Sequence, residues 1–252
     1  MNGSSVRRVA LVTFLVVAAT ALSGCFAFKQ VETAPPQVRT ETKTIPKAGT
    51  SELDARVRMP AGMLKVDGET KALVDMKFES TNPAWLPVVS TTRSEGASGT
   101  ITGLEVAVPQ SVPFLRGNTK KYEWNIHLSP DVPSRLRFEL GAGQSEIDLR
   151  GVDVRRLSVT TGVGETALDL SGARTHDLLA TVKCGIGEVT IRVPASAGVR
   201  VTGRQEGIGN LTADGFTLSG EQLTNAAWAT SPTKIEISLQ RGIGDVNIET
   251  VD

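Results

Sequence analysis

The 252-residue sequence has few of the residues on which most catalytic and metal centres depend. It contains two His and two Cys, too few for a multi-histidine metal centre or a disulfide-rich scaffold. Lys plus Arg and Asp plus Glu number 27 each, so no net positive charge favours nucleic acid, and we expect none as a partner. Aromatic residues make up only 4% of the chain, yet a hydrophobic content of 40% is sufficient for a folded core.

The first 24 residues have the plan of a secretory signal peptide. A basic start precedes an apolar run from Val9 to Leu22, which is too short to span a membrane comfortably. The run ends in the motif Leu22-Ser23-Gly24-Cys25, which resembles the bacterial lipobox. That resemblance implies cleavage before Cys25 and acylation of its thiol, with the membrane as a partner through the lipid anchor. Two alternatives stay open: an uncleaved anchor, and a secreted protein whose cysteine is incidental.

The segment after the signal peptide has the composition of a linker. From Phe28 to Glu52 the chain is rich in Pro and Thr and shows no apolar periodicity. The sequence therefore predicts that residues 25–52 comprise the lipidated Cys25 and an extended tether, which holds the following domain away from the membrane.

From Leu53 onward, short segments of alternating apolar and polar residues are separated by Gly, Pro and Ser. This pattern predicts an all-β protein with no helix beyond the signal peptide. We predict an N-terminal β segment over residues 53–134, either a separate domain or the first coils of a repeat domain over residues 135–252. A degenerate turn at Pro60-Ala61-Gly62-Met63-Leu64 could belong to an atypical capping unit.

A Gly-x-Gly motif recurs five times in residues 135–252. The glycines are Gly141 and Gly143, Gly162 and Gly164, Gly185 and Gly187, Gly207 and Gly209, and Gly242 and Gly244. The spacings of 21, 23, 22 and 35 residues are typical of a β-solenoid-like stack of strands joined by repeated turns. We expect each glycine to adopt a positive φ or to let a neighbouring turn approach closely, and Gly203 to mark a β-bulge.

A polar residue follows every Gly-x-Gly motif, and a regular stack would align these residues along one edge. They are Gln144, Glu165, Glu188, Asn210 and Asp245. Such a ladder could bind Ca²⁺ through its oxygens, but Ca²⁺-binding β-rolls use shorter repeats, which favours a solvated edge that limits aggregation. The motifs lack the third glycine and the following helix of a dinucleotide site, so we expect no cofactor.

The remaining candidates for catalysis are scattered. His127 alternates with apolar residues in a predicted strand and should point to water, and His176 lies in a polar turn. No serine occupies a Gly-x-Ser-x-Gly elbow. The sequence therefore predicts that the protein is not an enzyme, with no catalytic and no metal-binding residues.

Four further side chains invite a structural interpretation. Cys184 falls on the apolar face of its repeat, which predicts a buried core thiol and no disulfide. Trp124 is expected in the core. For Trp85 and Trp228 a core position and an exposed contact position both stay open.

Together, several motifs resemble a bacterial toast-rack envelope protein over residues 53–252. They are the lipobox, Trp124-Asn-Ile126-His-Leu128 and Phe138-Glu-Leu140-Gly141-Ala-Gly143 with its repeats, and Asn225-Ala-Ala-Trp228 is also similar. In that family a toast-rack segment precedes repeated Gly-x-Gly turns. Related domains occur in predicted adhesins and in cell-wall-active-antibiotic response proteins. The resemblance implies the fold and supplies no catalytic residues.

We therefore expect a membrane-anchored extracytoplasmic lipoprotein that acts as a non-catalytic binding or scaffold module in the cell-envelope stress response. The alternative is an adhesin or a protein that binds cell-wall glycan, and a hydrolase with an unusual site in residues 53–134 is a third hypothesis. Expected partners are an envelope protein or cell-wall polymer. Self-association through strand edges is a further expectation, because the chain stops at Asp252 just after its last predicted strand, with no evident cap.

Overall fold

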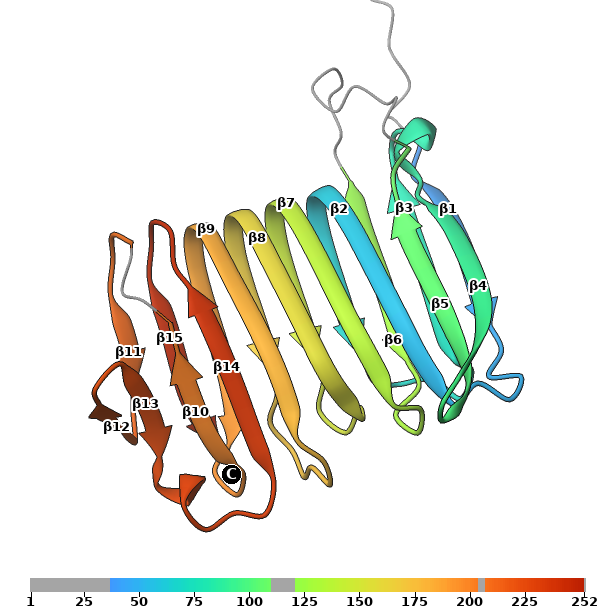
Figure 1. The fold of residues 1–252 in the computed structure, drawn as a ribbon. Helices are drawn as coiled ribbons and strands as arrows, with labels where there is room; N and C mark the ends of the chain where they lie inside the picture. The colour runs from blue at the N-terminus through green and yellow to red at the C-terminus, as the bar shows by residue number, and fades with distance from the viewer. Residues whose placement is uncertain (1–36, 110–120, 204–206, 252) are drawn as a thin grey trace, which may run out of the picture. The chain divides into compact units, whose positions relative to one another are not determined.

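The computed structural model describes residues 37–109, 121–203 and 207–251. The predicted signal peptide, the lipobox residues Leu22, Ser23 and Gly24, and the lipidation site Cys25 lie outside the described residues and stay predictions. The described part is built from 15 strands in one continuous sheet (Figure 1). Its helices are two single 3₁₀ turns, η1 (Pro83–Trp85) and η2 (Ala226–Trp228), so the prediction of an all-β fold is confirmed.

The strands differ widely in length. Four of them, β2, β7, β8 and β9, have 15 to 17 residues, and the others have 3 to 9. In chain order they are β1 (Arg39–Ile45), β2 (Glu52–Asp67), β3 (Val74–Ser80), β4 (Val88–Gly96), β5 (Gly99–Ala107), β6 (Tyr122–Leu128), β7 (Ser134–Asp148), β8 (Val154–Asp169), β9 (Leu178–Pro194), β10 (Gly198–Thr202), β11 (Leu211–Ala213), β12 (Phe216–Ser219), β13 (Gln222–Asn225), β14 (Lys234–Gln240) and β15 (Val246–Val251).

Each long strand bends near its middle and so has two arms. The first arm of β2 pairs with β5 and the second with β6, whereas β7, β8 and β9 pair in parallel along both arms. The sheet therefore doubles back on itself, and its two halves enclose one continuous hydrophobic core (Figure 1). The bends form one edge of the stack, where the β3–β4 connection with η1 also lies, and the loops between successive long strands form the other (Figure 1). This is the predicted solenoid-like stack of strands.

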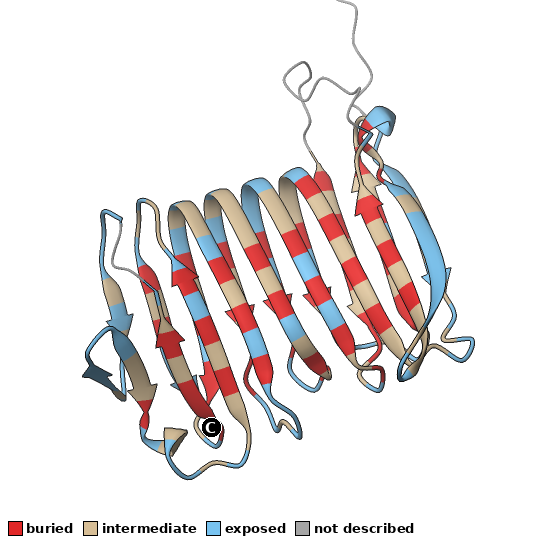
Figure 2. Cartoon of the chain, in the orientation of Figure 1, coloured by how far each residue is buried: buried red, intermediate tan, exposed pale blue. Residues whose placement is uncertain are grey.

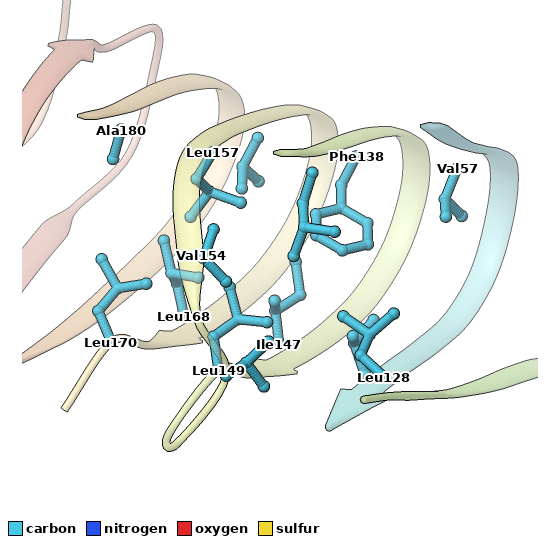
Figure 3. Close-up of a cluster of buried hydrophobic side chains, with 14 of the residues drawn as sticks. Val57, Leu128, Phe138, Ile147, Leu149, Val154, Leu157, Leu168, Leu170 and Ala180 are labelled. Carbon is cyan, nitrogen blue, oxygen red and sulfur yellow. The ribbon is translucent and has the colours of Figure 1, made fainter. Parts of the chain in front are cut away.

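The core follows from period-two alternation on both sides of each bend. Buried residues alternate with more exposed ones along the long strands (Figure 2). In β8, Leu157 and Val159 before the bend and Leu168 after it are at most 3% exposed. Leu157, Leu168 and the neighbouring Phe138 and Ile147 point into the space between the arms (Figure 3). Successive side chains of a strand alternate between faces, so one apolar face per arm suffices to fill the interior.

We call each bent strand, or each pair of strands that occupies the two arms, one coil of the stack. The N-terminal half contributes the first coils and forms no separate domain. Gly62 in the bend of β2 pairs in register with Gly143 in the bend of β7, which confirms the degenerate turn at Pro60 to Leu64. That turn does not cap the stack, because β5 and β4 continue one half of the sheet beyond β2, and β6, β3 and β1 continue the other.

Part of the predicted tether is a strand. Residues 39–45 form β1, which pairs antiparallel with β3 over its full length. The segment Arg-Thr-Glu-Thr-Lys-Thr-Ile places β-branched threonines at alternate positions, which suits a solvent-exposed edge strand. Its polar composition has no apolar periodicity, and pairing with β3 is what gives it order. The tether prediction therefore fails for these residues.

The order of the coils in space differs from their order in the chain. The last strands, β14 and β15, pair in parallel with the two arms of β9. The earlier strands β10 and β11 pair with β14 and β15 and so form the outermost coil, extended by β13 and β12. β15, the last strand of the chain, therefore lies inside the stack, and among the described strands the expected unpaired edges at this end belong to β11 and β12. Strict alternation from Ile235 to Leu239 matches β9, whereas β10 ends at Thr202 and is followed by Gly203, which has φ +138.

Candidate binding surfaces

The Gly-x-Gly bends stack directly on one another along one edge of the molecule. Their register runs from the bend of β2 through those of β7, β8 and β9. It continues through two bridges, from Ile186 to Ile243 and from Ile243 to Ile208. All five predicted motifs, together with the degenerate turn at Gly62, therefore form one row.

The two glycines of each bend are required for different reasons. At the second position both reasons apply: Gly187 has φ +137, and a Cβ there would lie 1.9 Å from the carbonyl oxygen of Gly164. At the first position, Gly185 needs no positive φ, but a Cβ would lie 2.1 Å from the carbonyl oxygen of Gly162. Real Cβ atoms do not approach carbonyl oxygens this closely, so the tight stacking of the bends requires glycine.

The polar residues after the bends form the predicted ladder. The Gln144 amide donates to Glu165 at 3.2 Å, and the Asn210 backbone NH donates to Asp245 at 2.8 Å. Glu188 pairs in register with Glu165 and accepts a bond from the Asn247 amide at 3.1 Å. Among the described residues, no group of three or more His, Cys, Asp or Glu side chains is arranged to hold a metal ion.

The middle residues of the bends form a row of apolar side chains, which we call the bend ridge; they are exposed in every bend except that of β2. In spatial order it consists of Ala61, Ala142, Val163, Ile186, Ile243 and Ile208. Val163, Ile186 and Ile243 are 50 to 53% exposed, and Ile208 is 72% exposed. The prediction of the bends rested on their glycines and did not include this row, although the sequence shows it: none of the middle positions holds a polar residue.

The C-terminal end of the stack is open, and it contains a cleft with a volume of about 930 Å³, which we call the terminal cleft. Its apolar lining comes from both halves of the sheet and consists of Val201, Leu211, Ala213, Leu218, Leu223 and Leu239. Leu218 is 61% exposed, while Val201 and Leu239 form the buried floor. Among the described strands, β12 pairs with β13 alone and β11 with β15 alone, so each has an unpaired edge beside the cleft.

The opposite end of the stack is filled with aromatic rings. Trp124 and Phe78 meet edge to face with ring centroids 5.5 Å apart, and Tyr122 contacts both Trp124 and Trp85 in the same manner. Trp124 is 0% and Trp85 4% exposed. The core prediction for Trp124 is confirmed, and the open question on Trp85 is settled in favour of the core.

A family profile described as the N-terminal domain of toast_rack, DUF2154, matches residues 34–192. The chain belongs to the toast-rack family. This match covers more than half of the sequence and agrees with the stacked bends and with the resemblance inferred from the sequence motifs.

Two solved structures to which this toast-rack protein is similar are described as adhesion proteins. One, "a putative cell adhesion protein" from Clostridium sporogenes, is 25% identical, with a TM-score of 0.76, and the match covers 85% of this chain and 100% of that chain. Another, "a putative adhesin" from Bacteroides fragilis, is 15% identical over 85% of this chain and 98% of that chain, with a TM-score of 0.33. A comparison with curated proteins gave no match.

Both histidines of the toast-rack protein lie beside carboxylates. His127 lies on the outer face of β6, where its Nδ1 is 2.7 Å from Asp67, and His176 lies 3.6 Å from Asp153 in the predicted polar turn. Cys184 is half-buried beside a bend, and burial raises the pKa of its thiol to about 11. A thiol with a raised pKa is a poor nucleophile at neutral pH. Cys184 packs against the core and is only partly buried, so the prediction of a buried core thiol holds in part.

The Asn225 to Trp228 stretch anchors the outermost coil. The buried Asn225 amide accepts from the backbone NH of Val199 at 2.9 Å and donates to the carbonyl oxygen of Ala197 at 2.8 Å. Trp228 is half-buried, with the Arg200 guanidinium 4.6 Å from its ring centroid. Trp228 is therefore an intermediate case between the core and contact positions that the sequence left open.

Proposed function

We propose that this toast-rack protein is a lipid-anchored, extracytoplasmic, adhesin-type protein that binds a partner protein without catalysis, and that the terminal cleft holds an extended apolar segment of that partner. The proposal rests on one asymmetry. One end of the stack is filled by Trp85, Tyr122 and Trp124, while the other keeps a cleft between two strand edges, lined by both aliphatic and polar residues. The similarity to a protein described as a "putative cell adhesion protein" supports the adhesin class, and the lipobox motif supports the anchor.

The chemistry of the cleft favours an extended peptide over other ligands. Unpaired backbone groups of β11 and β12 offer hydrogen bonds to an added strand, and the leucines between them offer contacts to its alternate side chains. The volume lies within the range typical of ligand sites. At the other end the exposed edge strands carry charges, such as Lys43 in β1 and Arg93 in β4, which discourage strand addition.

The test is crosslinking of the full-length protein in its own membranes, followed by mass spectrometry. Leu218→Asp or Leu223→Asp should abolish capture of the partner, whereas Leu179→Asp, at an exposed leucine outside the cleft, should leave capture unchanged. Cys25→Ala should move the protein from the membrane to the soluble fraction.

Three results would contradict parts of this proposal. Capture that survives both cleft substitutions would exclude the cleft as the binding site. Retention on purified cell wall, unaffected by the same substitutions, would indicate a glycan ligand. Crosslinks to further copies of the chain alone would indicate self-association through the strand edges in place of a distinct partner.

A role in the cell-envelope stress response is a second candidate, suggested by the resemblance of the sequence motifs to those of domains in cell-wall-active-antibiotic response proteins. It predicts that loss of the protein changes the response to cell-wall-active antibiotics and that Cys25→Ala has the same effect as deletion. An unchanged response in both strains would exclude this role.

A further inference from the structure

Exposed large hydrophobic side chains of the described residues gather at one edge of the stack. Eight such residues are at least 45% exposed. Leu179 and Leu218 lie elsewhere. The other six lie at the edge formed by the bends: Val38, Val88, Val163, Ile186, Ile208 and Ile243. An apolar surface gathered on one side of a protein usually marks a contact with a partner or a membrane.

Packing within the fold does not explain the bend ridge. Its valine and isoleucine side chains are 50 to 72% exposed. The glycines on either side of these four residues already satisfy the geometry of the bends. A solvent-exposed turn normally carries polar residues, yet the middle position holds Val or Ile in Val163, Ile186, Ile243 and Ile208. These side chains are therefore available to an external apolar surface.

The described chain begins at this same edge. Arg39 pairs with Ser80, and Ser80 pairs with Tyr122. The carbonyl oxygen of Tyr122 lies 2.5 Å from the Cβ position of Gly62, in the row of bends. Arg39 lies 14 positions after Cys25, which limits the distance from the lipidated residue to this edge to roughly 50 Å. The loop edge lies farther along the chain, beyond the seven residues of β1.

Both edges carry exposed charges, but only the bend edge also carries a row of exposed aliphatic side chains. The loop edge carries charged, exposed side chains, including Asp131, Arg150 and Asp177. Beside the bend ridge, the carboxylates of Glu165, Glu188 and Asp245 on one flank are partly offset by Lys183 and Arg241 on the other. This mixed charge provides little attraction for an anionic surface, so contact at the ridge would depend on its aliphatic side chains.

We propose that the bend edge faces the membrane and that the bend ridge rests against the lipid bilayer that holds the anchor. This inference rests on the proposed lipid anchor at Cys25. The bilayer is the occupant that fits, because the anchored chain enters the fold at this edge and the exposed aliphatic residues lie beside its entry point. The stack then lies along the membrane, and the terminal cleft opens sideways toward proteins of the same envelope surface.

The experiment uses the full-length, lipidated protein in phosphatidylcholine vesicles that carry nitroxide-labelled lipid. In a Cys184→Ala background, Ile186→Cys and Ile243→Cys are each labelled with a fluorophore, with Arg150→Cys at the loop edge and Leu179→Cys as controls. Labels at 186 and 243 should be quenched by the nitroxide lipid and shift to shorter emission wavelength. Labels at 150 and 179 should show neither effect. Added salt should not change the result.

A second set of variants tests the ridge itself. A label at Ile208→Cys should lose its quenching when Ile186 and Ile243 are both replaced by Ser, and keep it when Leu179 is replaced by Ser. Equal quenching at positions 186, 243 and 150 in vesicle-bound protein would overturn the proposed orientation while leaving the anchor intact. Protein that fails to sediment with vesicles would overturn both the anchor and the orientation.

Discussion

The carbonyl oxygen of Gly143 lies 1.8 Å from the position that a Cβ atom on Gly164 would occupy. A side chain at residue 164 therefore cannot be accommodated unless the backbone of the neighbouring coil moves. Similar contacts occur between Gly62 and Gly143 and between Gly164 and Gly187, so the shape of each bend depends on the bend before it. This coupling makes the bend edge the most constrained part of the fold.

Gly164→Ala should lower the free energy of unfolding by at least about 3 kcal/mol, because it combines a strained φ of +134 with a backbone clash. Urea denaturation of the purified protein measures the change. Gly151→Ala is the matched control, since Gly151 has φ +72 and no heavy atom within 4 Å of its Cβ position. We expect a loss of about 1 kcal/mol there. Equal losses would show that φ, and not the contact between coils, controls stability.

Asn225→Ala should destabilise the outermost coil by about 2 kcal/mol, because the backbone NH of Val199 and the carbonyl oxygen of Ala197 both lose their partner. Hydrogen exchange of the Val199 amide should accelerate in the variant. Asn210→Ala, at an exposed asparagine, should stay within about 0.5 kcal/mol of the parent protein. Unchanged protection of Val199 would argue against an anchoring role for Asn225.

Trp124→Ala should cost about 4 kcal/mol, because it leaves a cavity among Phe78, Tyr122 and the surrounding core. Trp228→Ala should lower the free energy of unfolding by less, because the Trp228 ring is only half-buried and its main polar contacts are the cations of Arg200 and Lys234. Thermal unfolding of the two variants gives the ranking. A larger effect at Trp228 would contradict the assignment of Trp124 to the core.

Alkylation of Cys184 should be slow in the folded protein, because burial raises the pKa of the thiol to about 11 and the thiolate is the reactive form. Below pH 9 the thiol is protonated in both the folded and the unfolded protein. As the pH rises from 9 toward 11, the free energy of unfolding falls, because the unfolded thiol ionises at a lower pH than the folded one. Iodoacetamide kinetics in a Cys25→Ala background, with and without urea, measure the effect. Equal rates in both conditions would contradict it.

The sequence by itself determined the fold class and the row of bends. Apolar and polar residues alternate on both sides of the Gly-x-Gly motifs. This alternation identifies the buried residues, such as Phe138 before one bend and Ile147 after it, because each arm turns a single apolar face to the core. The two glycines identify the bends, because no other residue tolerates the close backbone contacts. These are local properties, and the sequence carries them directly.

Only the tertiary structure decided the order of the coils, the strand β1 and the terminal cleft. The Ile235 to Leu239 segment pairs with β9 ahead of β10, and residues 39–45 become ordered through pairing with β3. Leu211 and Leu218 form a cleft because they lie in the outermost coil. Each of these outcomes depends on which of several distant strands pairs with a given sheet edge. The choice of pairing partner leaves no periodic pattern in the sequence.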